Sequence, residues 1–392
     1  MRALLLLAVM GCASPAFADG LPRPPAWLQP TLLGDVDAQL HPSEVEGENG
    51  FSLRRLRLGL RATPVSWFSA VASAELIGGE GPRVFEGYLE VRPAAAWAIS
   101  LGYRRAPLFH SARDLPIEAL AVPELASPVQ AFWPGVDLGL EVHHRPVELP
   151  IDAWLRVGNG AGTPAGNDSD HLAYEGRVDL VLGRARGRAG DASRFFGLRV
   201  GVGGHFKDEV DAPGLAGLTE GGFAFYRATP VDGWRREGEA HLALWLARLT
   251  ITAEGALALE DRARPPARAG GPRAPLDAVA SRGGSVEVAY MLRGPARVPG
   301  AWPNPAPFTA SSWTSGGVEL AARAERLVMG LGARDVAPNG LTGEAVALRW
   351  WTTRFLGLGL AAYHFGYDAA PIEEPLVRSS WLVLARATVT VR

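Results

Sequence analysis

Strict alternation of apolar and charged side chains limits what this chain can fold into. In Phe51–Thr63, FSLRRLRLGLRAT, every second residue from position 56 to position 62 is apolar, and Arg55, Arg57 and Arg61 occupy the other positions. Successive side chains of a β-strand point to opposite faces, so this pattern gives a strand with one apolar and one cationic face. The apolar face needs a cover, which is a second layer in a soluble protein or lipid around a membrane barrel.

Similar alternating segments recur to the end of the chain. Each is roughly 8–13 residues long, which is close to the length that a tilted strand needs to cross a bilayer. Bacterial single-chain barrels have an even number of strands. We therefore predict an all-β fold, a transmembrane antiparallel barrel of about sixteen strands, near 31–40, 51–62, 67–76, 84–92, 97–104, 135–144, 151–157, 172–182, 195–206, 234–246, 249–259, 285–292, 315–327, 341–351, 355–364 and 380–391.

The connections between these segments alternate in length. Short turns such as Pro64–Ser66 and Thr352–Arg354 follow even-numbered segments, whereas long polar or Gly/Pro-rich loops such as Lys207–Gly233 and Glu260–Gly284 follow odd-numbered ones. This order is typical of barrels with short periplasmic turns and long extracellular loops. One connection, Arg293–Thr314, is long where a short turn is expected.

The first residues have the composition of an export signal. A basic start is followed by the apolar run Ala3–Gly11 and by Ala16-Phe17-Ala18, which predicts a signal peptide over 1–18. The expected organisation is completed by a periplasmic lead over 19–30 and the barrel over 31–392. The only cysteine, Cys12, lies in the signal peptide, so the mature chain is expected to have no disulfide.

Charge and motifs exclude several classes of protein. The formal net charge is -2, so the chain lacks the basic field of a nucleic-acid binder. It contains no G-x-S-x-G, H-E-x-x-H, Walker or C-x-x-C motif, and we predict no enzyme activity, no cofactor and no metal site. A barrel hydrolase remains a lower-ranked alternative, because its serine and histidine would lie far apart in the sequence.

Several segments together carry a family resemblance: Phe51–Thr63, GYRRAPLF at Gly102–Phe109, Val157–Val178, Gly283–Gly294 and Gly316–Leu327. In this order they resemble the phosphate-selective porin O and P family of Gram-negative outer membranes. The resemblance implies a location in the outer membrane, contact with its lipid, a homotrimer and the passage of small anions.

The family is known for an arginine ladder in the lumen, and the second predicted strand is similar to it. The resemblance also implies that the long loop Arg105–Pro134 folds inward as a constriction. Two features differ from the family. Its lysines near the constriction have no counterpart, since Lys207 is the only lysine among 39 basic residues, and the chain ends in Val391-Arg392 instead of an aromatic residue.

The candidate site consists of charged residues that the alternation places on the lumenal side of the strands, together with one arginine of the long loop. As pore-lining and selectivity residues we predict Arg55, Arg57, Arg61, Arg104, Arg113, Arg156, Arg177, Arg199, Glu86, Glu90, Asp137 and Glu141. Rings or patches of such charges determine which ions pass a pore. The alternative for any one residue is that it pairs with an opposite charge on a neighbouring strand and only keeps the lumen hydrated.

Two functions follow from this reading. The first is an outer-membrane porin for passive diffusion of small polar solutes, with an anion or phosphate preference from the lumenal arginines. The second is a closed or plugged barrel with a structural or interaction role. Mixed lumenal charge and the bulky, inward-facing Trp154, Trp245 and Trp351 favour the second.

Overall fold

A computed structural model describes residues 25–391, except 43–46, 48, 78–80, 168, 187–195, 265–272, 304–315, 372–373 and 375. The signal peptide predicted for 1–18 and most of the lead predicted for 19–30 lie outside the described residues. Among the described helices, none combines the length and the apolar composition needed to cross a bilayer.

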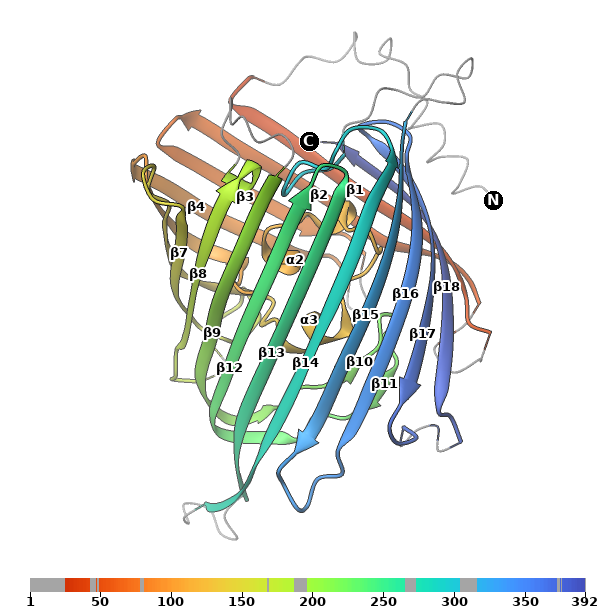
Figure 1. Ribbon diagram of the computed structural model, residues 1–392. Coiled ribbons are helices and arrows are strands. Elements are labelled where there is room, and N and C mark those ends of the chain that lie inside the picture. The colour runs from red at the N-terminus through yellow and green to blue at the C-terminus, as the bar shows by residue number, and fades with distance from the viewer. Residues whose placement is uncertain are drawn as a thin grey trace.

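Sixteen strands of the described chain form a closed antiparallel barrel (Figure 1). Each strand pairs with the next one along the barrel, and β18 returns to pair with β1. This confirms the predicted fold class. The strands are β1 Leu28–Leu40, β2 Gly50–Val65, β3 Phe68–Glu75, β4 Arg83–Ala94, β5 Trp97–Arg105, β6 Val136–His144, β7 Ile151–Gly158, β8 Ala173–Gly183, β9 Phe196–Pro213, β12 Pro230–Leu246, β13 Leu249–Arg264, β14 Ala274–Arg293, β15 Gly317–Leu331, β16 Asn339–Trp351, β17 Leu356–Tyr367 and β18 Ser379–Val391.

Alternation of side chains explains why these segments form a membrane barrel. On β8 each residue from Ala173 to Val181 alternates between buried and more exposed. On β2, Leu58 and Leu60 are 47% and 42% exposed on the outer surface, while Arg57 contacts the carboxylate of Glu75 on the inner side. Since a charge facing lipid at mid-depth costs about 2–4 kcal/mol, this segregation is the one that a bilayer stabilises.

The remaining elements lie in the connections. The loop between β5 and β6, residues 106–135, contains α2 His110–Arg113, η2 Ile117–Ala119 and α3 Ser127–Phe132. Figure 1 shows α2 and α3 inside the ring of strands, which confirms the predicted inward-folded loop. We call residues 106–135 the lumen loop. A small hairpin of β10 Gly217–Leu218 and β11 Ala224–Tyr226 lies between β9 and β12, and η3 Arg184–Arg186 follows β8.

Four strands are longer than the sequence pattern predicts. The predicted loops Lys207–Gly233 and Glu260–Gly284 are partly wrong, because β9 and β12 pair as far as Pro213 and Pro230, and β13 and β14 pair as far as Arg264 and Ala274. The ends of these strands have charged residues on both faces, so no apolar alternation marks them in the sequence. Their backbone pairing with the neighbouring strand nevertheless continues. At the other end of the chain, β1 begins at Leu28, inside the predicted lead.

The barrel has a turn end and a loop end. The turn end carries the short turns after β2, β4, β12 and β16, together with the start of β1 and the end of β18. The long connection after Arg293 also starts at the turn end, as expected from the sequence. Its described part returns into the barrel, where Arg297 pairs with Glu319 and donates a hydrogen bond of 2.6 Å to the carbonyl oxygen of Ala119.

Candidate functional site

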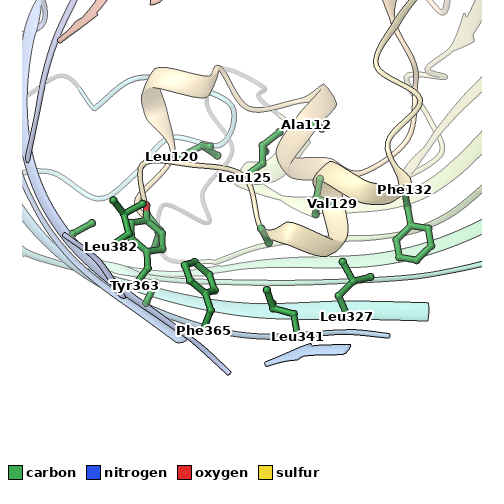
Figure 2. Close-up of a cluster of buried hydrophobic side chains, with 14 of the residues drawn as sticks. Ala112, Leu120, Leu125, Val129, Phe132, Leu327, Leu341, Tyr363, Phe365 and Leu382 are labelled. Carbon is green, nitrogen blue, oxygen red and sulfur yellow. The ribbon is translucent and has the colours of Figure 1, made fainter. Parts of the chain in front are cut away.

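One side of the lumen loop is held by an apolar cluster inside the barrel. Figure 2 shows Leu120, Leu125, Val129 and Phe132 of the loop facing side chains of β15–β18. The wall side of this cluster includes Leu327, Leu341, Tyr363, Phe365 and Leu382. Such residues on the inner face of strands are unusual for a water-filled lumen, and burying them against the loop stabilises the folded loop.

The opposite side of the lumen loop is held by ion pairs. Asp114 accepts hydrogen bonds from Arg177 at 2.6 Å and Arg199 at 3.1 Å. Both arginines also pair with Asp179, and His110 contacts Asp114 at 2.9 Å. Burial alone would raise the pKa of the Asp114 carboxyl, but the two guanidinium groups outweigh it and hold this pKa well below its ordinary value. The carboxylate is therefore charged and bridges the loop to β8 and β9.

A glycine on β9 makes this close approach possible. A Cβ atom at Gly203 would lie 2.7 Å from Cδ2 of Leu108 in the lumen loop and 2.7 Å from Oε1 of Glu239. A larger side chain at this inward position would displace the ends of the Leu108 and Glu239 side chains.

A second group of ion pairs joins the lumen loop to β4–β6. Arg113 of the loop pairs with Glu141 at 2.5 Å, and Arg104 pairs with the same carboxylate at 3.0 Å. Arg104 also lies 3.5 Å from Glu90. These four predicted site residues therefore neutralise one another inside the barrel.

A third group lies on β6–β8. Arg156, which is 1% exposed, pairs with Glu175 at 3.0 Å and lies 3.9 Å from Asp137. Asp137 also accepts hydrogen bonds from the backbone nitrogens of Gly160 and Gly162. In this group, Asp137 joins β6 to the connection between β7 and β8.

Glu124 of the lumen loop links the two ends of the barrel sheet. Its carboxylate lies 2.7 Å from Arg55 of β2 and 2.5 Å from Arg386 of β18. Arg386 also pairs with Asp37 of β1 at 2.7 Å, and Arg55 pairs with Asp35 of β1 at 2.9 Å. One loop carboxylate thus contacts strands on both sides of β1.

Between the lumen loop and β1–β4 the interior remains open. A cavity of about 900 Å³ lies there, and its lining extends from Gln29 and Val391 near the turn end to Ile77 and Arg83 near the loop end. We call its basic residues the arginine wall: Arg54, Arg55, Arg57, Arg61, Arg83 and Arg105. The carboxylates in the lining are Glu75, Glu86, Glu118 and Glu124. The lining therefore has an excess of positive charge.

Members of the arginine wall differ in their pairing. Arg57 pairs with Glu75 at 3.0 Å and lies over the ring of Phe85, while Arg105 pairs with Glu86 at 3.3 Å. Arg61 and Arg83 have no ion-pair partner within the described part of the chain. These two guanidinium groups, one toward each end of the cavity, are the ones most available to a passing anion.

The cavity separates the predicted site residues into two groups. Arg55, Arg57, Arg61 and Glu86 belong to its lining. The remaining predicted residues lie outside this lining, in the ion-pair groups described above: Arg104, Arg113, Arg156, Arg177, Arg199, Glu90, Asp137 and Glu141.

Some lining residues were missed from the sequence. Arg54 lies at an irregularity of β2, where the register with β1 shifts between Asp35 and Val36, so it departs from the period of two. Arg83 stands at the first position of β4, where a strand assignment is least certain. Arg105 is the last residue of β5, where the sequence predicted the start of the loop. Glu124 belongs to the loop, and no alternation pattern indicates which loop residues face the lumen.

The three tryptophans that favoured a plugged barrel are buried inside. Trp245 lies 5.7 Å from the ring of His110, Trp154 stacks on His143 at 4.5 Å, and Trp351 contacts Trp302 at 4.6 Å. None of the three lines the open cavity. Among the residues that the structure describes, no group of three or more His, Cys, Asp or Glu side chains is arranged to hold a metal ion.

Comparison with known proteins gives a likeness in structure alone. No protein-family model and no curated protein sequence matches this chain. A loop-deletion variant of OmpT, an outer membrane protein of Vibrio cholerae, superposes with a TM-score of 0.58 at 10% identity over 93% of this chain and 99% of that chain.

Two further structures are similar over the same share of this chain. An anion-selective porin from Comamonas acidovorans has a TM-score of 0.55 at 10% identity, with 93% of this chain and 99% of that chain covered. The outer membrane channel DcaP of Acinetobacter baumannii has a TM-score of 0.52 at 11% identity, with 93% and 96% covered. At this level of identity the likeness establishes the barrel fold.

Proposed function

We propose that this chain is an outer-membrane porin through which small polar solutes, and anions in preference to cations, diffuse passively. The single observation that carries the proposal is the cavity between the lumen loop and β1–β4, whose lining has more arginines than carboxylates. Positive side chains around a narrow water-filled path raise the local concentration of anions and set which ions pass.

Several expectations from the sequence belong to the same proposal. Export by a signal peptide over 1–18, residence in the outer membrane and assembly as a homotrimer agree with the barrel fold and with a solved OmpT described as a trimer form. The mechanism is diffusion, which requires no catalysis and no cofactor.

A specific preference for phosphate has weaker support than a general preference for anions. The resemblance to the phosphate-selective family implies lysines near the constriction, but Lys207 is buried beside Glu209 at 3.0 Å and is not part of the cavity lining. We therefore keep phosphate as a narrower version of the proposal.

The test is a planar-bilayer recording of the purified protein across a KCl gradient. In the variant carrying Arg61→Glu and Arg83→Glu, we expect the ratio of chloride to potassium permeability to fall about tenfold, because four units of charge change near the path. Neither arginine has an ion-pair partner in the described residues, so the barrel is expected to fold.

The matched control is Arg354→Glu, a charge reversal in the short turn between β16 and β17, away from the cavity lining. Its reversal potential should equal that of the unmodified protein. Complete absence of conductance would support the second candidate, a closed barrel, which the apolar filling of the lumen on the β15–β18 side favours.

A further inference from the structure

The cavity has two chemically different sides. One side is the arginine wall. The other is formed by partly buried apolar side chains of the lumen loop, which we call the apolar loop face: Leu115, Pro116, Ile117 and Trp133. Because both sets line the same space of about 900 Å³, a solute in this space meets both.

The apolar loop face packs against the buried cluster through Leu115, Ile117 and Trp133, and it also stays partly open to the cavity. The same loop buries Leu120, Val122 and Phe132 almost completely, at 4%, 0% and 1% exposure. Leu115, Pro116, Ile117 and Trp133, in contrast, are only partly buried. Apolar area left in contact with water costs free energy that burial would recover, at about 25 cal/mol per Å². A solute with an apolar body would cover the part of this area that the loop itself leaves open.

We propose that the cavity binds organic anions in which a carboxylate is attached to an apolar body, and that it prefers them to inorganic anions. This inference rests on the proposed porin function and names its substrate class. The carboxylate would pair with guanidinium groups of the arginine wall, which suit its planar geometry. The apolar body would contact the apolar loop face and remove that area from water. The volume is within the range of small-molecule sites.

The experiment measures block of single-channel KCl current by benzoate, acetate and inorganic phosphate, added separately to one protein preparation. Benzoate and acetate present the same carboxylate and differ in the apolar body. We expect the half-blocking concentration of benzoate to be about tenfold below that of acetate and of phosphate, since contact with a ring-sized apolar group is worth roughly one order of magnitude in affinity.

Variants of the apolar loop face test the assignment to this side of the cavity. Two variants are tested separately, Trp133→Ala and Ile117→Ser. In each, the half-blocking concentration of phosphate divided by that of benzoate should fall several-fold, toward one. Trp234→Ala removes a tryptophan that is 46% exposed and outside the lining, and its ratio should match that of the unmodified protein. Two independent variants keep the test valid if one of them fails to fold.

The outcomes separate this inference from the function on which it rests. If KCl current flows with an anion preference but benzoate and acetate block equally, the inference is overturned and the porin function stands. If Ile117→Ser and Trp133→Ala both fold and leave the ratio unchanged, the assignment to the loop face is wrong. If no current flows in KCl, the proposed function itself fails.

Discussion

At the scale of single residues, pairing decides which charges are available in the lumen. Arg156 and Arg177 are 1% exposed and their guanidinium groups contact carboxylates, whereas Arg61 and Arg83 are exposed and without an ion-pair partner in the described residues. Alternation in the sequence identifies three of them as candidates for the lumen. It misses Arg83, which lies one position before the predicted strand 84–92. It cannot identify their partners, because those partners are set by how the lumen loop docks.

Glu220 gives a prediction at this scale. It lies between β10 and β11, pairs with Arg323 at 2.5 Å and accepts a hydrogen bond of 3.1 Å from the hydroxyl of Ser127 at the start of α3. Burial, and then the nearby Glu325 carboxylate, raise the pKa of Glu220 well above its ordinary value. The docked hairpin therefore favours the protonated carboxyl.

The sign of the pH dependence follows from this shift. Docking of the hairpin is fully stabilised at low pH, and the stabilisation is lost as the pH rises from the ordinary pKa of a glutamate through the raised one. We expect faster hydrogen exchange at Gly217–Tyr226 as the pH increases, after correction for the intrinsic rate. Glu220→Gln should remove this pH dependence, and an unchanged pH profile in this variant would contradict the assignment.

At the scale of elements, the lumen loop is held by two kinds of contact. Its α3 side packs on the apolar inner face of β15–β18, and its α2 side is joined to β8 and β9 through Asp114. This arrangement places the loop against one half of the barrel and leaves the cavity beside β1–β4. The path proposed for solutes thus lies off the barrel axis.

Asp114→Asn should loosen the α2 side of the loop. The change weakens charged hydrogen bonds to Arg177 and Arg199, which costs about 2–3 kcal/mol of docking free energy. We expect larger fluctuations of the open-channel current and faster tryptic cleavage within residues 106–135.

Asp368→Asn is the control for that variant. Asp368 also pairs with an arginine, Arg326, but the two side chains are half-exposed. Its current noise and cleavage pattern should stay those of the unmodified protein. Equal noise in both variants would mean that Asp114 does not hold the loop.

The sequence allowed the sixteen strands to be predicted, since each carries at least one stretch of period two. It did not allow the outer parts of β9 and β12–β14 to be predicted, because both faces there are polar and the pairing of Arg235 with Glu260 across strands cannot be read from one strand. The hairpin β10–β11 was missed for another reason. Strands of two and three residues are too short to show any period.

At the scale of the whole molecule, the barrel is apolar outside, and its interior holds the ion pairs beside the apolar cluster of the lumen loop. Leu140, Leu155, Val202 and Leu320 are among the outward side chains that are at least 47% exposed. In water such a surface would associate, and in a bilayer it is solvated by lipid. The apolar outer surface and the ion pairs of the interior are therefore stable together only in a membrane.

Leu155→Arg tests this arrangement. Leu155 is 63% exposed near the middle of β7, and a cation at that depth should destabilise the inserted barrel by about 2–4 kcal/mol. We expect a lower urea midpoint for unfolding from lipid vesicles, measured by the heat-dependent shift in gel mobility. Leu376→Arg, at a loop position that is 95% exposed, should leave the midpoint unchanged.

The contacts of Glu124 have a consequence for biogenesis. This loop carboxylate joins β2 to β18 across β1, where the first and last strands of the barrel meet. The seam can acquire its full set of bonds only after the segment carrying Glu124 has entered the ring. Docking of the lumen loop and closure of the barrel therefore stabilise each other during assembly.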